Sequence, residues 1–322
     1  MNLDLLVSNI TNPAFLFFIL GVIAVKLKSD LEIPPNSSKF ISLYLLFSIG
    51  FKGGQELSHE TFSAEIIWSM LFGIAVSLLI PVYTFFILKK KMNVYDAGAI
   101  AAAYGSVSAV TFVTAVSYLE FQKMEFHGHM VAIMALMESP AIIAGLILMS
   151  VFNKEEKTQV NKLSVIKHSF TNGSVLLILG SLVIGLLANA KQAEGIKPFT
   201  NDIFKGFLAI FLLDMGITSG RKLSAFFSNG WFPVLFAIII PLINGCAIAL
   251  LSGFVTQDIS NRFMFSVLAA SASYIAVPAA MKLAAPKANA GLYIPMALAI
   301  TFPFNITFGM PVYLSIIKYV IF

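Results

Sequence analysis

Long apolar runs dominate the chain and are separated by short polar connections. A bilayer core about 30 Å thick is spanned by roughly 20 helical residues, fewer where a segment is kinked. Ten runs fit this length, near residues 13–28, 40–54, 65–88, 94–119, 127–152, 171–190, 203–220, 229–255, 260–285 and 290–320. Because backbone in lipid must satisfy its own hydrogen bonds, we predict a helix for each run. The pattern therefore predicts an all-α membrane protein with ten transmembrane helices.

The basic residues are distributed unevenly over the connections. With the N-terminus outside, 14 of the 21 Lys and Arg residues fall on the inner side. This bias predicts a multi-pass protein of the inner (plasma) membrane, with both termini outside and a cytoplasmic linker at 154–169. The first run follows Asp4 rather than a basic region and lacks a small-x-small cleavage site. We therefore expect it to be retained rather than removed as a signal peptide.

The second half of the chain repeats motifs of the first half in the same order. The matching pairs are LLFSIGFKGGQELS (45–58) with FLLDMGITSGRKLS (211–224), GSVSAVTFVTA (105–115) with ASASYIAVPAA (270–280), and MALMESP (134–140) with MALAITFP (296–303). Each half holds five runs, so the second half must start from the opposite side of the membrane. We predict inverted repeats at 1–153 and 170–322, joined by the 154–169 linker, as in secondary transporters with a midplane site.

Small hydroxyl side chains gather within the fourth and ninth runs, the second time just before Pro278. We predict an interrupted helix at both places. Gly105 and the small hydroxyls can line the first interruption, and Pro278, which lacks the N–H that a helix needs, weakens the second helix. The freed N–H groups and the partly positive helix ends suit a small anion. The predicted substrate-binding residues are Gly105, Ser106, Val107, Ser108, Ser271, Ala272 and Ser273. The alternative is that these hydroxyls bond to their own helices or allow close helix packing.

Two carboxylates, Glu138 and Asp214, fall within predicted spans. A charge at that depth costs at least about 2.5 kcal/mol, so it normally faces a cavity or a partner. Glu138 lies two residues before Pro140, where it could coordinate a cation or carry a proton; alternatively, it is a neutral acid bonded to another helix. Asp214 lies beside Gly216 and is interpreted as a structural partner of a backbone group or of Lys205.

Composition narrows the function classes. The chain is 58% hydrophobic and only 11% charged, against about 25% charged in soluble domains. Cys246 is the single cysteine and the four histidines are scattered, so neither an intramolecular disulfide nor a zinc site is expected. The net charge is +5, and the lysines that contribute to it lie mostly between apolar runs. We therefore expect a lipid bilayer rather than nucleic acid as partner.

The sequence lacks H-E-x-x-H and G-x-S-x-G motifs and has no histidine near the serine clusters. We therefore expect neither an enzyme nor a resident cofactor, with an intramembrane hydrolase as the competing class. A channel is the competing membrane function, because the same breaks could line a pore.

Several motifs resemble the cyanobacterial sodium-dependent bicarbonate transporter family along nearly the whole chain. They are LAASASYIAVPAAMKLAAPKANAGLYIPMAL (268–298), YGSVSAVT (104–111) and MESPA (137–141). The resemblance implies ten helices in inverted repeats, core and gate domains, a common trimeric assembly, and uptake of bicarbonate with Na+ between the two breaks. By this resemblance, the residues that match or neighbour the family's break positions are Ser106, Ser108, Thr111, Ser271 and Ser273. The residue at the family's acidic position is Glu138.

The chain departs from the family pattern where coupling ions bind. The acid after the second serine cluster is Tyr274 here, and the central linker is shorter, which removes the basis for a regulator that docks there. We expect fewer or weaker cation sites: one Na+ at Glu138, or proton coupling through Glu138 itself, since an acid taken out of water favours its neutral form. The candidate cation ligands are Glu138, Ser108, Thr111, Ser273 and Thr301. The alternative is that an oxygen of Thr301 or Asn305 replaces the missing acid and completes the family's original site. Another small carboxylate or anion coupled to protons is the alternative substrate class.

Overall fold

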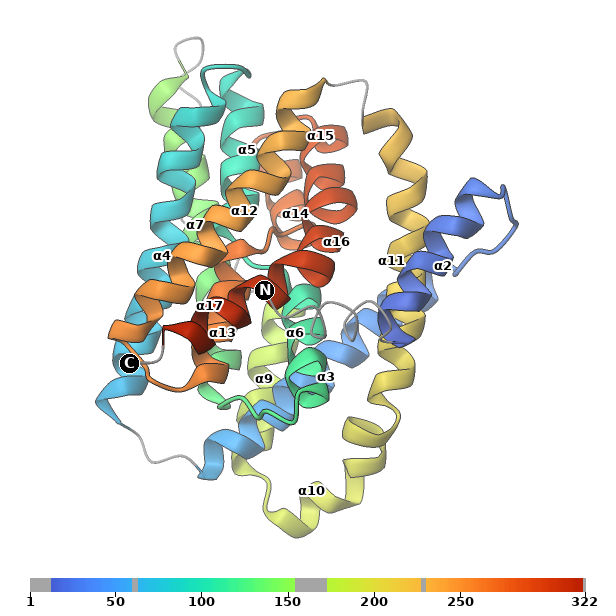
Figure 1. Cartoon of the computed structure of the whole chain (residues 1–322), viewed down its shortest axis with the longest axis vertical. Helices are drawn as coiled ribbons and strands as arrows, with labels where there is room; N and C mark the ends of the chain where they lie inside the picture. Colours follow the sequence, from blue (N-terminus) through green and yellow to red (C-terminus); the bar gives the residue numbers. More distant parts are fainter. Residues whose placement is uncertain (1–12, 60–62, 154–172, 227–229, 321–322) are drawn as a thin grey trace.

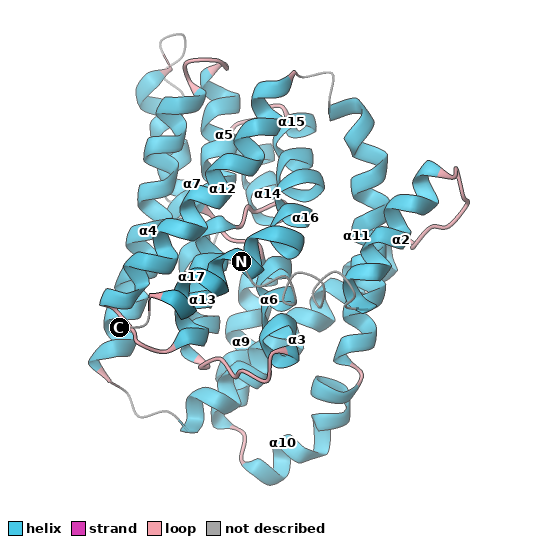
Figure 2. Ribbon diagram, viewed as in Figure 1, coloured by secondary structure: helices cyan, strands magenta, loops and turns pink. Residues whose placement is uncertain are grey.

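The computed structural model describes residues 13–59, 63–153, 173–226 and 230–320, and the regular elements in these ranges are all helices (Figure 2). The first half contains α2 (Pro13–Lys26), α3 (Pro35–His59), α4 (Ala64–Leu88), α5 (Val94–Gly105), α6 (Ala109–Phe121) and α7 (His129–Phe152). The second half contains α9 (Gly173–Leu187), α10 (Ala190–Lys197), η1 (Pro198–Asp202), α11 (Phe204–Phe226), α12 (Trp231–Leu251), η3 (Ser252–Phe254), α13 (Ile259–Ala270), α14 (Ala276–Ala284), α15 (Ala290–Pro295), η4 (Met296–Thr301), α16 (Phe302–Phe304), η5 (Asn305–Gly309) and α17 (Met310–Tyr319).

Six helical stretches are long and apolar enough to cross a bilayer: Ala64–Leu88, Val94–Phe121, His129–Phe152, Ala190–Lys222, Trp231–Phe254 and Ala290–Tyr319. Two shorter apolar helices cover Phe15–Lys26 and Leu176–Leu187. The all-α prediction is confirmed, whereas the ten-helix inverted repeat stays a prediction. The ninth predicted run is divided into α13 and α14, which are each too short to span alone. The 154–169 linker lies outside the described residues.

The helices pack in two groups (Figure 1). The core group consists of α4 to α7 and α12 to α17, in which α4, α5 and α7 pack together and α12 packs on α13 and α17. The side group consists of α2, α3, α9, α10 and α11. Within the side group, α3 lies along α9 and α2 lies along α11, so each pair joins a helix of the first half to one of the second.

Glycines bring the backbones of these paired helices into contact. A Cβ at Gly54 of α3 would lie 2.1 Å from the Leu182 carbonyl oxygen of α9. A Cβ at Gly216 of α11 would lie 2.1 Å from the Phe18 carbonyl oxygen of α2. Small residues at crossings are a common feature of helix packing in membranes. A Cβ at Gly50, the residue that matches Gly216 in the repeated motifs, would lie 2.6 Å from the Ile178 carbonyl oxygen of α9. Matching glycines therefore serve the same purpose in both halves.

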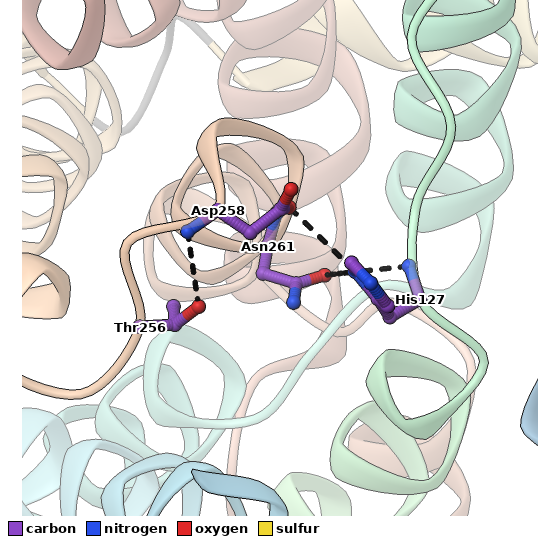
Figure 3. A network of polar contacts seen from close by, with 4 residues as sticks. All are labelled: His127, Thr256, Asp258 and Asn261. Atoms are coloured by element: carbon purple, nitrogen blue, oxygen red, sulfur yellow. Dashed lines mark hydrogen bonds and ion pairs between the residues drawn. The ribbon is translucent and has the colours of Figure 1, made fainter. Parts of the chain in front are cut away.

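A polar cluster holds the start of α13 against the connection before α7 (Figure 3). The Asp258 side chain caps α13 by accepting the Asn261 N–H at 2.8 Å, and the Asp258 N–H donates to Thr256 Oγ1 at 3.2 Å. Asn261 Oδ1 accepts the His127 N–H at 3.3 Å, and His127 Nδ1 lies 3.7 Å from Asp258 Oδ1. Two side chains of the second half, those of Asp258 and Asn261, thus hold a connection of the first half.

The start of α5 has the corresponding arrangement with the halves exchanged. The Asn93 side chain accepts the Asp96 N–H at 2.9 Å, and Asp96 Oδ1 accepts the Asn289 N–H at 2.7 Å from the connection before α15. The N-caps of α5 and α13 are separated by the same number of residues as Ser106 and Ser271. The two interrupted helices are therefore anchored in equivalent ways.

Candidate functional site

The chain leaves helical geometry at 106–108, between α5 and α6, and at 271–275, between α13 and α14. These are the two places where the hydroxyl clusters predict interruptions. The residues that end the leading helices adopt nearly the same extended conformation, with φ −80° and ψ 172° at Ser106 and φ −81° and ψ 168° at Ser271. Ser106 and Ser271, which match in the sequence repeat, thus also share their backbone conformation.

The two breaks lie against each other and exchange hydrogen bonds. The Ser108 N–H donates to Ser271 Oγ at 3.0 Å, and the Ser271 hydroxyl donates to the Leu268 carbonyl at 2.8 Å. In the opposite direction, the Ser273 N–H donates to the Ala103 carbonyl at 2.8 Å. The fold thus brings the predicted serines of both halves into one buried cluster.

These bonds differ from the expectation that the breaks leave their N–H groups free. The Ser108 and Ser273 N–H groups are used across the halves, because the two breaks are in direct contact. Ser108 Oγ also caps α6 by accepting the Thr111 N–H at 3.1 Å. Among the described residues, the N–H groups of Ala109 and Val110 in the first turn of α6 have no acceptor. The donors that stay free are fewer than the sequence suggests.

The first break packs on neighbouring helices of the core group. A Cβ at Gly105 would lie 2.2 Å from Cγ of Pro81 in α4, so this close approach requires glycine. The Ser106 hydroxyl donates to the Glu138 carbonyl of α7 at 3.4 Å. The Glu138 side chain is partly exposed, and no hydrogen bond or ion pair joins it to a described residue. An acid without a bonded partner therefore stands next to the first break.

Two residues of the last helical segment form hydrogen bonds near the ends of the helices that lead into the breaks. The Thr301 hydroxyl donates to the Ala237 carbonyl at 2.7 Å and lies 2.8 Å from the Tyr104 hydroxyl. Asn305 Nδ2 donates to the Ala270 carbonyl at 2.7 Å, at the end of α13. In this arrangement the two predicted cation ligands of this segment hold the ends of α5 and α13.

A cavity of about 440 Å³, which we call the Tyr274 cavity, reaches the second break from the side group. Its lining includes Tyr274, Ile275, Ser38, Asp214 and Arg221. The Tyr274 hydroxyl is buried beside the Ser108 side chain but has no hydrogen-bond partner among the described residues. This cavity connects a polar surface to the breaks.

The interpretation of Asp214 as a partner of Lys205 is wrong. The Asp214 carboxylate accepts a hydrogen bond from the Ser38 hydroxyl, and Lys205 pairs with Glu120 instead, at 3.4 Å. Lys205 lies nine residues before Asp214 on the same helix, about 13 Å along the axis, which is too far for a direct ion pair. Asp214 therefore joins α11 to the start of α3.

Sequence reasoning missed a second cavity of about 210 Å³, which we call the Glu120 cavity. It is lined by Ser48, Ile49, Lys52, Glu120, Thr200, Asn201, Phe204 and Lys205. Its only sequence signal is Lys52 within an apolar run, because its charged residues come from three separate segments.

The described ranges contain no group of three or more His, Cys, Asp or Glu side chains placed to hold a metal ion. The oxygen atoms near Glu138 and the breaks are mainly hydroxyls and backbone carbonyls. Hard oxygen donors of this kind suit hard cations rather than soft transition metals.

Comparison with known proteins agrees with this geometry. A search of curated proteins finds no match to the chain. The family model described as the Na+-dependent bicarbonate transporter superfamily matches residues 13–318, which is nearly the full length. The chain therefore belongs to the Na+-dependent bicarbonate transporter superfamily.

Proposed function

We propose that the protein is a secondary active transporter that imports a small anion, bicarbonate, together with Na+ by alternating access. The observation that carries the proposal is the contact between the two breaks, where Ser108 and Ser271 bond across the halves. Helix breaks from two repeats that meet inside the bundle are the usual substrate site of secondary transporters. The glycine crossings and exchanged N-cap contacts support the inverted repeat on which this reading depends.

The anion site that we propose becomes available when the two breaks separate. Separation frees the Ser108 and Ser273 N–H groups, which then join the unpaired N–H groups of Ala109 and Val110. Bicarbonate has acceptor oxygens for several such donors, and each hydrogen bond to a charged ligand contributes about 1.5–3 kcal/mol. The hydroxyls of Ser106 and Ser271 are the side-chain donors of this site.

The two cavities support alternation between sides. Ser38 lines the Tyr274 cavity and Ser48 lines the Glu120 cavity, and ten helical residues separate them by about 15 Å along α3. The Tyr274 cavity also contains Lys39 and Arg221, which the distribution of basic residues places toward the cytoplasm. We therefore assign this conformation as inward-facing, with the second break accessible from the cytoplasm.

Glu138 is the acid that we assign to cation coupling. Its backbone carbonyl accepts the Ser106 hydroxyl, and no described residue bonds to its carboxylate. The charge is therefore available to a Na+ that hydroxyl and carbonyl oxygens also hold. Tyr274 supplies only a neutral hydroxyl at the second break, so one Na+ per anion is the stoichiometry that we propose. Coupling to a proton on Glu138, with another small carboxylate as substrate, is the second candidate, favoured by the same residue.

Uptake of radiolabelled bicarbonate into proteoliposomes tests the proposal. We expect accumulation driven by an inward Na+ gradient and abolished when Na+ is replaced by K+ at the same pH. Accumulation driven by a proton gradient without Na+ would favour the second candidate. Failure to accumulate bicarbonate under either gradient would contradict the proposal, and unitary currents in planar bilayers would identify a channel.

A further inference from the structure

The Glu120 cavity joins both helix groups through charged side chains. Lys52 comes from α3 and Lys205 from α11, both in the side group, whereas Glu120 lies near the end of α6 in the core group. Lys52 Nζ is 2.5 Å from Glu120 Oε1, and Lys205 Nζ is 3.4 Å from Glu120 Oε2. Two ammonium groups thus hold the two oxygens of one carboxylate.

The positive charge in this cavity exceeds the negative charge. Lys52 and Lys205 face a single acid among the lining residues, which leaves one unit of positive charge. The Lys52 and Glu120 side chains are each 28% exposed, and Lys205 is 67% exposed, so water and small ions reach them. Such a cavity attracts anions.

Uncharged hydrogen-bonding groups complete the cavity. Ser48 is 1% exposed, and its hydroxyl has no hydrogen-bond partner in the described part of the chain. Tyr44, one turn earlier on α3, donates instead to the Phe199 carbonyl at 2.5 Å. The Ser48 hydroxyl is thus a buried polar group in the cavity lining that can donate to an acceptor placed in the cavity. Thr200 and Asn201 line the same cavity.

We propose that Lys52 and Lys205, with Ser48, form a second anion site that is distinct from the two breaks and takes a small planar oxyanion of the bicarbonate type. In the present conformation the Glu120 carboxylate occupies this site, because it has the same planar arrangement of oxygens on carbon. Movement of the core group relative to the side group withdraws Glu120 and leaves both lysines to an incoming anion. The inference rests on the proposed function and assigns this site the capture of substrate before it reaches the breaks.

Substitutions on the two sides of the cluster distinguish an anion site from a simple latch. Lys52→Met removes a ligand of the anion, so we expect the KM for bicarbonate uptake to rise about tenfold, the effect of one lost charged contact. Glu120→Gln removes the competing carboxylate, so we expect KM to fall. A latch that only fastens the two groups is broken equally from either side. Changes of KM in the same direction in both variants would therefore overturn the proposal.

A matched control and a second measurement distinguish a failure of this proposal from a failure of the proposed transport function. Lys197 pairs with Glu194 at 3.6 Å on exposed α10, and Lys197→Met removes the same charge away from the cavity, so its KM should match the unsubstituted protein. In purified Glu120→Gln protein, bicarbonate should slow modification of Lys52 by an amine-reactive reagent, measured by peptide mass spectrometry, and leave Lys197 unaffected. Protection of Lys52 supports the site even if uptake fails, and equal modification of Lys52 with and without bicarbonate overturns it.

Discussion

The substitution Ser271→Ala removes the side-chain hydrogen bond between the two breaks. It also removes the bond from the Ser271 hydroxyl to the Leu268 carbonyl, which keeps the Ser271 N–H as a donor. Ser271 Oγ is the acceptor of the Ser108 N–H at 3.0 Å, and both residues are almost fully buried. Alanine removes this acceptor and leaves the N–H without a partner inside the protein. Ser273→Ala is the matched control, because Ser273 reaches the other half through its backbone N–H, which alanine keeps.

The expected magnitude follows from the cost of an unpaired buried donor. Such a group costs about 1–3 kcal/mol, and each 1.4 kcal/mol corresponds to a tenfold change in an equilibrium. Opening of the first break should therefore become roughly 5- to 140-fold more frequent in Ser271→Ala. In Ser273→Ala only the long contact of Ser273 Oγ with the Val277 N–H, at 3.4 Å, is lost, so opening should change little.

Amide hydrogen exchange measures this opening directly. A peptide covering residues 104–111 should exchange faster in Ser271→Ala, whereas Ser273→Ala should match the unsubstituted protein. Melting temperatures of both variants, measured in parallel, show whether the whole bundle has loosened. The reasoning is refuted if exchange in this peptide is unchanged in Ser271→Ala, or if Ser273→Ala accelerates it as strongly.

Three further outcomes are expected. Glu138→Gln should fold normally but lose gradient-driven uptake, because it removes the charge beside the first break. Full uptake by this variant would show that Glu138 has only a structural role. Gly54→Ala should lower the melting temperature, since its Cβ would lie 2.1 Å from the Leu182 carbonyl oxygen and overpacking costs about 1–3 kcal/mol. Gly180→Ala, with nothing within 4 Å of the added carbon, is the control, and equal melting temperatures would disprove a tight crossing. Uptake against Na+ concentration should give a Hill coefficient near one, and a value clearly above one would require a second Na+ despite Tyr274.

Hydrophobic periodicity and local chemistry predicted much of the fold. Apolar runs locate helices because lipid permits few other backbone structures, and the clusters around Ser106 and Ser271 locate the breaks because small hydroxyls and a nearby proline weaken a helix. The matching Gly50 and Gly216 indicate close crossings because glycine is small enough to let two helix backbones touch. Each of these signals is contained within one segment of the chain.

Contacts between distant segments could not be predicted in the same way. The sequence does not say that α2 lies along α11 or that Lys52 and Lys205 share Glu120, because these partners depend on how helices approach in space. Asp214 illustrates the difficulty: its neighbours in sequence suggested Lys205, and its partner is Ser38 at the start of another helix. The unexpected closure of the breaks has the same origin, since the acceptor for Ser108 belongs to the other half.

Tyr274 links the chemistry of the breaks to their accessibility. Its ring lines the cavity that we assign to the cytoplasmic side, and its buried hydroxyl lies beside Ser108 without a hydrogen-bond partner in the described ranges. An anion passing from the breaks into the cavity has acceptor oxygens for that hydroxyl, whereas a carboxylate at this position would repel it. Tyr274 supplies no charge to a cation site, which is in keeping with the single Na+ at Glu138 that we propose.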